Sequence, residues 1–105
     1  IDARDFKVIR DLMPELKNLD IKNTSIVEYR GSDGTYEGNV TYGADEIPFY
    51  AFYNGNIDVG KKALESIILP ISLKSIGNSA FGRCSGIDSI NISAEVKYIV
   101  NMSVV

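Results

Sequence analysis

The stretch LKSIGNSAFGRC, residues 73–84, ends in the only cysteine of the chain, so we test it first for reactive chemistry. The sequence has no histidine, so neither a Ser–His–Asp triad nor a Cys–His pair can form within this chain. A single thiol also cannot make an intramolecular disulfide or a multi-thiolate metal site. We therefore interpret Cys84 as a small buried core residue, with a reactive or intermolecular thiol as the alternative.

The acidic residues are the next candidates for chemistry. A glycosidase needs two carboxylates held about 5–10 Å apart across a cleft, and nothing in the spacing here requires that arrangement. The stretch Asp33-Gly-Thr-Tyr-Glu37 resembles a calcium loop only loosely, because alternating acidic ligands are missing. We predict no catalytic residue, no metal and no cofactor, and a hydrolase is the least favoured function. The carboxylates considered are Asp33, Glu37, Asp45, Glu46 and Asp58.

Tyrosines gather between residues 29 and 53, and an arginine and aspartates accompany them. Tyr and Arg are enriched at recognition surfaces because they combine a large contact area with a polar tip. For Tyr50 and Tyr53 we favour simple packing beside the Ala51-Phe52 pair. The predicted ligand-binding residues are Tyr29, Arg30, Asp33, Tyr36 and Tyr42. For the three tyrosines in this set, packing within a loop is the alternative.

Composition narrows the class of protein. The chain has 105 residues, enough for one domain with a modest core. Its net charge of −3 and the absence of a basic stripe argue against nucleic acid as a partner. No apolar run approaches the roughly 18–20 residues that a transmembrane helix needs. The N-terminal IDARDFKV lacks the layout of a signal peptide, so we expect any export signal to lie upstream of this segment.

The stretch DARDFKVIRDLMPEL predicts an N-terminal helix. Asp2 is a plausible N-cap, and Asp5 lies three residues on, as in a capping box. Pro14 disfavours helical geometry at Met13, so the helix should end there. The residues that predict its buried face are Phe6, Ile9, Leu12 and Met13.

Three short motifs share apolar residues at their first, fourth and sixth positions. They are Leu16-Lys-Asn-Leu19-Asp-Ile21, Leu64-Glu-Ser-Ile67-Ile-Leu69 and Ile87-Asp-Ser-Ile90-Asn-Ile92. Each ends in an alternation that predicts a short strand with one buried face. The second and third motifs are 23 residues apart, and so are Leu73-Lys-Ser-Ile76 and Val96-Lys-Tyr-Ile99. A period in the twenties is typical of stacked solenoid repeats.

A further correspondence joins Ile47-Pro-Phe-Tyr-Ala-Phe52 to Ile76-Gly-Asn-Ser-Ala-Phe81, 29 residues later. The difference from 23 predicts a six-residue insertion within about 54–62, a Gly- and Asn-containing stretch suited to a loop. The Gly77-to-Ala80 stretch should form a tight turn into a short helical or turn segment, with Phe52 and Phe81 stacked inside. Residues 27–46 form an irregular loop, or a hairpin around Asp33-Gly34.

Residues 64–92 resemble a known repeat. The pattern Leu64-x-x-Ile67-x-Leu69-Pro70-x-Ser72-Leu73-x-x-Ile76-Gly77-x-x-Ala80-Phe81-x-x-Cys84-x-x-Ile87 is similar to the BspA-like, treponemal-type leucine-rich repeat of bacterial surface and secreted proteins. The helix, the L-x-x-L-D-I strand and the Gly-Thr-containing loop before it are similar to what precedes such repeats in gut Bacteroidetes proteins. The chain departs from the pattern at 103–104, where Ser-Val replaces Ala-Phe, so the last repeat is truncated or degenerate.

This resemblance implies an α/β fold: a short right-handed leucine-rich-repeat solenoid with parallel strands and an N-terminal capping helix. One domain would span 1–105, with the helix and first strand in 1–26, the irregular loop in 27–46 and the BspA-like repeats in 47–105. Its repeat core would consist of Leu16, Leu19, Ile21, Phe52, Leu64, Ile67, Leu69, Ile76, Phe81, Cys84, Ile87, Ile90 and Ile92.

The resemblance also implies a function. It indicates a non-enzymatic, secreted or cell-surface bacterial module for protein binding and adhesion, whose ligand is a protein or a glycan. The alternative is a structural spacer or self-assembling repeat element, for instance a homodimer formed through the C-terminal strand.

Overall fold

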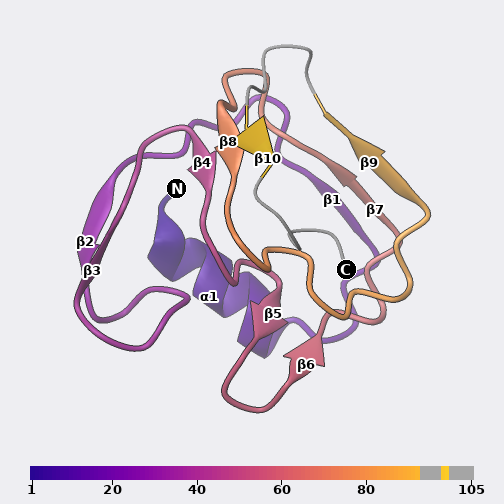
Figure 1. The fold of residues 1–105 in the computed structure, drawn as a ribbon. Helices are drawn as coiled ribbons and strands as arrows, with labels where there is room; N and C mark the ends of the chain where they lie inside the picture. The colour runs from indigo at the N-terminus through magenta and orange to yellow at the C-terminus, as the bar shows by residue number, and fades with distance from the viewer. Residues whose placement is uncertain (93–97, 100–105) are drawn as a thin grey trace.

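The structure is a computed structural model that describes residues 1–92 and 98–99. Helix α1 (Ala3–Leu12) lies beside a stack of short strands (Figure 1). Asp2 caps it as predicted: its Oδ1 accepts the Arg4 N–H at 2.9 Å, and its own N–H donates to Asp5 Oδ2 at 2.8 Å. The helix ends at Leu12, with Met13 as its C-cap before Pro14. The capping box and the helix end predicted from the sequence are therefore confirmed.

The predicted buried face of α1 is only half right. Phe6 is fully buried and Ile9 packs against the core, but Leu12 and Met13 are 73% and 41% exposed. The backbone of Met13 is no longer helical (φ −129°, ψ 61°), so its side chain does not continue the face of the helix. Arg10, four residues after Phe6, is buried on this side instead.

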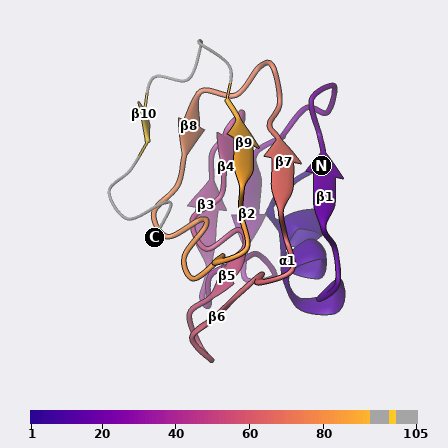
Figure 2. The same ribbon diagram turned by 90° about the vertical axis from the view of Figure 1, so that its right-hand side faces the viewer.

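Two three-stranded parallel sheets carry the repeat. The first has the order β1 (Asn18–Asp20), β7 (Ser66–Ile68), β9 (Ser89–Asn91), and its strands lie side by side in Figure 2. The second has the order β4 (Glu46–Ile47), β8 (Ser75–Ile76), β10 (Tyr98–Ile99). In the first sheet Leu19 pairs with Ile67 and Ile67 with Ile90. In the second, Ile47 and Ile99 both pair with Ile76. This is the register that the repeated motifs predict.

The core lies between the two sheets and α1. Phe52 and Phe81 stack at 5.1 Å between ring centroids, and Phe6 meets Phe52 edge-on at 5.8 Å. Leu16, Leu19, Ile87, Ile90 and Ile92 pack, partly buried, against a fully buried cluster. That cluster consists of Phe6, Ile21, Ile26, Ile47, Ala51, Phe52, Leu64, Ile67, Leu69, Leu73, Ile76, Ala80, Phe81 and Cys84. Burying such side chains supplies about 1.5–3 kcal/mol each, the main driving force for this fold.

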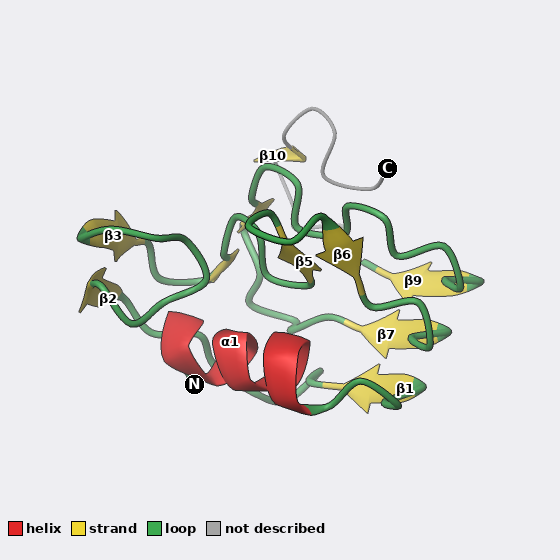
Figure 3. Ribbon diagram, turned by 90° about the horizontal axis from the view of Figure 1, so that it is seen from below, coloured by secondary structure: helices red, strands yellow, loops and turns green. Residues whose placement is uncertain are grey.

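Two antiparallel hairpins interrupt the repeat (Figure 3). Strands β2 (Tyr29–Gly31) and β3 (Val40–Tyr42) pair across residues 32–39, so residues 27–46 hold a hairpin rather than an irregular loop. The backbone N–H of Val27 donates to the Ile1 carbonyl at 2.8 Å, and that of Asp45 to the Ile26 carbonyl at 2.9 Å, which anchors both ends. Strands β5 (Tyr53–Asn54) and β6 (Val59–Gly60) form the second hairpin, where the insertion was predicted.

The repeat turns its corner through matching backbone conformations. Tyr50 and Ser79 occupy equivalent positions in successive units, and both have left-handed φ values near 60° and 54°. The turns stack, because the N–H of Tyr50 donates to the Asn78 carbonyl and that of Phe52 to the Ala80 carbonyl. Residues 78–83 are turns, so the helical form of this segment is absent from the described unit. The departure predicted at 103–104 lies outside the described residues.

Candidate functional site

The hairpin β2–β3 and the first repeat turn bring six aromatic rings into one connected series. Tyr29 stacks on Tyr42 at 6.0 Å between centroids, and Tyr42 stacks on Phe49 at 5.0 Å. Tyr36 meets Phe49 edge-on at 5.5 Å and stacks on Tyr50 at 5.4 Å. Tyr50 in turn stacks on Tyr53 at 5.9 Å. Residues that lie up to 24 positions apart in the sequence thus form one connected aromatic cluster.

A cleft of about 500 Å³ opens beside this series, between the hairpin and the second parallel sheet. We call it the aromatic cleft. Its volume falls in the range of about 300–1,000 Å³ that is typical of small-molecule sites. Thirteen residues line it: Tyr36, Thr41, Tyr42, Gly43, Glu46, Ile47, Pro48, Phe49, Tyr50, Ser75, Ile76, Gly77 and Asn78. It offers aromatic walls together with hydroxyl, carboxylate and amide groups.

Of the five predicted binding residues, two line the aromatic cleft and three do not. Tyr36 is 45% exposed and lines the aromatic cleft. Tyr42 lines it too but is buried, and its hydroxyl accepts the Tyr36 N–H at 2.9 Å, so its polar tip is occupied. Tyr29 lies between Tyr42 and the Arg4 guanidinium, and its hydroxyl accepts the Asp33 N–H at 3.2 Å. Tyr29 and Tyr42 therefore build the hairpin, and Tyr36 presents its surface.

Arg30 and Asp33 do not join this cleft. Arg30 is exposed and follows Tyr29 in strand β2, so its side chain lies on the opposite face of the hairpin. Asp33 is exposed at the start of the connecting loop and is absent from the cleft lining. Gly34 packs directly over the Tyr42 ring, where an added Cβ would lie 2.5 Å from ring atoms. The Asp33-Gly34 pair thus shapes the loop around Tyr42.

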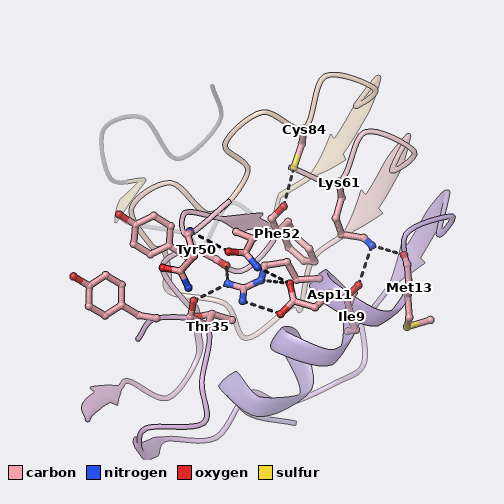
Figure 4. Close-up of polar contacts among 12 residues, drawn as sticks. Ile9, Asp11, Met13, Thr35, Tyr50, Phe52, Lys61 and Cys84 are labelled. Carbon is pink, nitrogen blue, oxygen red and sulfur yellow. Dashed lines mark hydrogen bonds and ion pairs between the residues drawn. The ribbon is translucent and has the colours of Figure 1, made fainter. Parts of the chain in front are cut away.

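A buried arginine holds the cleft together from beneath. Arg10 Nη1 donates to the Thr35 carbonyl at 2.6 Å and to the Tyr50 carbonyl at 3.2 Å (Figure 4). Its Nε and Nη2 donate to both carboxylate oxygens of Asp11, at 2.7 and 2.9 Å. This hydrogen-bonded partner holds the pKa of the Asp11 carboxyl below its usual value. Arg10 therefore ties α1 to the hairpin loop and to the left-handed turn at Tyr50.

Thr35 adds a second tie between the loop and the repeat. Its hydroxyl donates to the Phe49 carbonyl at 2.6 Å, and the residue is buried. This side-chain hydrogen bond therefore holds the loop that carries Tyr36 against the backbone of Phe49. A preorganised cleft of this kind loses less conformational entropy when a ligand binds.

The polar lining of the aromatic cleft carries negative rather than positive charge. Glu46 is half-buried in the lining, and among the described residues no hydrogen bond or ion pair involves its carboxylate. Thr41, Ser75 and Asn78 supply neutral polar groups around it. The Nζ of Lys74 lies 3.8 Å from Asp45 Oδ2, and Lys74 is not part of the lining. No lysine or arginine appears among the described residues that line the cleft.

A second hollow of about 320 Å³ adjoins the stacked Tyr36–Tyr50 pair. Its lining consists of Thr35, Tyr36, Glu37, Tyr50, Gly55 and Asn56. Tyr36 and Tyr50 belong to both hollows, so the stacked pair is a shared wall. Gly55 approaches the Tyr50 ring closely, since an added Cβ would lie 3.2 Å from it.

Two other polar groups have structural partners. Lys61 is buried, and its Nζ donates to the Ile9 carbonyl at 2.9 Å and to the Met13 carbonyl, which caps the end of α1. Burial lowers the pKa of this ammonium group. Asp58 Oδ1 accepts from the Tyr53 hydroxyl at 2.5 Å and from Arg83 Nε at 2.7 Å. These hydrogen bonds lower the pKa of Asp58 and tie the β5–β6 hairpin to the next turn.

Cys84 lies in the core next to the phenylalanine stack. Its Sγ donates to the Phe52 carbonyl at 3.4 Å, and the residue is only 8% exposed. Burial raises the pKa of the thiol, which disfavours the reactive thiolate. The geometry thus favours the core interpretation over the reactive one.

Sequence reasoning missed most of the cleft lining, including four residues with aromatic, carboxylate or amide side chains. Phe49, Tyr50, Glu46 and Asn78 line it, although none was a predicted binding residue. Phe49 and Tyr50 sit inside the repeat motif, where packing was the natural interpretation. A usable signal was present: Phe49 and Tyr50 precede Ala51-Phe52 where the next unit has Asn78 and Ser79. Large aromatics at positions that are small and polar in the next unit indicate a specialised turn.

The described part of the chain contains no group of three or more His, Cys, Asp or Glu residues that is arranged to hold a metal ion. Within those same residues, no helix has both the length and the apolar character required to cross a bilayer.

Comparison with known proteins places this geometry in a family. No curated protein matches the sequence. Residues 45–104, more than half of the chain, match the family described as the BspA type leucine rich repeat region (6 copies). Repeats of this family imply a solenoid-like fold and suggest a protein-interaction role, in agreement with the stacked parallel strands (Figure 2). The chain belongs to the BspA-type leucine-rich-repeat family.

Proposed function

We propose that this chain is a non-enzymatic interaction module of a bacterial surface or secreted protein, and that it binds its partner at the aromatic cleft. The observation that carries this proposal is the cleft of about 500 Å³ that Tyr36, Phe49 and Tyr50 line together with Glu46 and Asn78. Aromatic walls with a few convergent polar groups are the usual composition of ligand sites. Family membership supports a binding role, because leucine-rich repeats serve as interaction scaffolds.

A binding role fits the acidic residues better than a hydrolytic one. Asp45 and Asp58 have cationic partners in Lys74 and Arg83. The pKa of Asp58 is lowered, whereas a general acid needs a raised pKa. Glu46 and Glu37 line two different hollows, which share the Tyr36–Tyr50 pair. We therefore assign the two glutamates to recognition.

The architecture we propose is a short right-handed solenoid capped by α1. In this scheme residues 1–26 form the cap and first strand, the hairpin of residues 27–46 is the binding insertion, and residues 47–105 are the repeats. The parallel pairing of β1, β7 and β9 supports the stacking of units. We further propose secretion or surface display and a role in adhesion, which membership of a repeat family typical of bacterial surface proteins supports.

A binding array tests the proposal. Purified protein is applied to immobilised glycans and to extracellular host proteins, and the tightest partner is then titrated against variants. Tyr36→Ala and Glu46→Gln should each weaken binding about tenfold or more, since they remove a ring wall and a carboxylate of the cleft. Arg30→Ala, on the opposite face of the hairpin, should leave binding unchanged. Equal binding by all three variants would contradict the proposal.

Self-association is the second candidate, and one observation favours it. Strand β10 ends the sheet order β10-β8-β4, and none of the described strands pairs with its outer edge, to which a second copy would add in this scheme. Sedimentation velocity over a concentration series separates the two functions. A monomer at all concentrations supports the binding module, and a concentration-dependent dimer supports assembly.

A further inference from the structure

Tyr36 offers one ring face to a ligand. Its other face stacks on Tyr50 with an interplanar angle of 20°, and its edge is held by Phe49. Tyr36 is 45% exposed, although Tyr50, Phe49 and Tyr42 all contact it. The Tyr36 N–H donates to Tyr42 Oη, so the ring is anchored at its own backbone. A flat, rigid and exposed ring is a platform for a flat apolar surface.

The groups around that platform suit hydroxyl groups. A carboxylate accepts strong, charge-assisted hydrogen bonds, and Glu46 has no described partner that competes for its oxygens. The Asn78 amide can donate and accept, and Thr41 and Ser75 carry hydroxyls. A ligand that combines an apolar C–H face with many hydroxyls would satisfy both parts of the lining. A sugar ring has that combination.

Charge excludes anionic ligands. The described lining of both hollows contains Glu46 and Glu37 but no lysine or arginine. Binding a phosphate, sulfate or uronic acid here would place like charges together without a cation to compensate them. An uncharged ligand avoids this repulsion.

The geometry also disfavours an extended peptide. A peptide that adds to a sheet edge gains affinity from main-chain hydrogen bonds along that edge. The strands that border the aromatic cleft are β3, with three residues, and β4 and β8, with two each. Their edges are too short to give such a peptide many of these bonds. Side-chain contacts must therefore supply most of the binding energy.

We propose that the aromatic cleft binds an uncharged carbohydrate that continues past the stacked Tyr36–Tyr50 pair into the second hollow, so that the two hollows are neighbouring subsites. One sugar unit lies in the hollow of about 500 Å³ against Phe49, Glu46 and Asn78. The next reaches the hollow of about 320 Å³, where Thr35, Glu37 and Asn56 provide polar contacts. The ligand is therefore an oligosaccharide rather than a single sugar. This inference rests on the proposed function and names the ligand class of the same site.

In the test, oligosaccharide probes are titrated into the whole chain, and binding is monitored by calorimetry and NMR. The neutral probes are the hexasaccharides of cellulose, amylose, xylan, laminarin, mannan and chitin. Heparin fragments and oligogalacturonate form the anionic arm, and a hexapeptide rich in lysine and arginine forms the cationic peptide arm. We expect at least one neutral hexasaccharide to bind, its monosaccharide to bind at least tenfold more weakly, and the anionic probes not to bind.

Variants show whether binding uses the platform. Tyr36→Ala should weaken binding of the neutral hexasaccharide about tenfold or more. Tyr36→Phe keeps the ring, so its affinity should stay within about threefold of that of the wild type. No described hydrogen bond involves the Tyr36 hydroxyl, so Tyr36→Phe also serves as the variant that preserves the fold. Glu37→Gln should weaken binding of the hexasaccharide but not binding of the monosaccharide. Arg30→Ala is the matched surface control.

The outcomes separate this inference from the proposed function. If no neutral hexasaccharide binds, or if one binds equally well to Tyr36→Ala, the carbohydrate inference is overturned. If the basic peptide or a host protein binds in a Tyr36-dependent manner while the sugars do not, the carbohydrate inference is wrong and the binding module stands. If partners bind but no cleft variant affects any of them, the proposed function itself fails.

Discussion

At the scale of single residues, Arg10 has the most unusual position. A guanidinium whose side chain is 5% exposed is costly to bury unless its donors are paired. Here the Thr35 and Tyr50 carbonyls and the Asp11 carboxylate receive those donors. The contacts join segments 25 and 40 residues apart in the sequence. Arg10 thus links the helix to the hairpin loop and to the turn at Tyr50.

Replacing Arg10 with Met should therefore destabilise the protein by about 2–4 kcal/mol, because two buried carbonyls lose a charged donor. Urea unfolding followed by circular dichroism measures this change. Lys7→Met, at an exposed position of the same helix, should change stability by less than about 0.5 kcal/mol. Equal stability of both variants would show that the Arg10 contacts contribute nothing.

Cys84 supports a second prediction at this scale. Because the thiol is buried and its pKa is raised, an aromatic disulfide reagent should label native protein at least about 100-fold more slowly than urea-unfolded protein. Absorbance at the reagent's thiolate band gives both rates. Native labelling as fast as unfolded labelling would place the thiol at the surface and return it to the list of reactive groups.

At the scale of elements, the first turn of α1 depends on Asp2. The Arg4 side chain hydrogen-bonds its carboxylate and lowers the pKa of Asp2 below the ordinary 3.8. A lowered pKa in the folded state means that the carboxylate stabilises the protein above about pH 3.8. That contribution is lost as the pH falls through the lowered value.

Two substitutions separate the cap from the charge. Asp2→Ala should cost about 1 kcal/mol at pH 7 because the Arg4 N–H loses its acceptor. Asp2→Asn keeps an acceptor and should cost less. The stability difference between wild type and Asp2→Asn should shrink as the pH falls below 3.8. Thermal unfolding at several pH values measures it, and a constant difference would contradict the role of the charge.

The hairpin β2–β3 shows where sequence reasoning lost precision at this scale. Alternation of side chains could predict that Tyr29 and Arg30 face opposite ways, once a strand was assigned there. The short strand, the glycines and the charged residues favoured a loop instead. Tyr36 and Tyr50 could not be paired from local patterns, since their stack depends on the Arg10 and Thr35 contacts beneath them.

At the scale of the whole molecule, the stacking of repeat units was predictable. Offsets of 23 and 29 residues matched the strand registers because each unit must align its apolar residues with those of its neighbour. The cleft was less predictable, since it lies where the β2–β3 hairpin meets two successive repeat turns and no single unit contains it. Insertions follow no period, so a periodic pattern gives their place but not their shape.

Close packing of successive turns gives a prediction at this scale. A Cβ at Gly77 would lie 2.4 Å from the backbone nitrogen of Phe49, so the neighbouring turn would have to move. Gly77→Ala should therefore destabilise the protein by about 2 kcal/mol or more. Gly55→Ala meets only a side-chain atom at 3.2 Å and should cost less. Chemical unfolding of both variants provides the comparison, and the reverse order would contradict this packing.

The central claim is that the aromatic cleft, and not the outer face of the sheet β1-β7-β9, contacts the partner. Amide chemical shifts, followed in ¹H–¹⁵N spectra while the tightest-binding partner is titrated, test it most directly. We expect the largest changes at Tyr36, Phe49, Tyr50 and Asn78, which line the cleft. Changes confined to Asp20, Ile68 and Asn91, which share one position across the three strands, would contradict the claim.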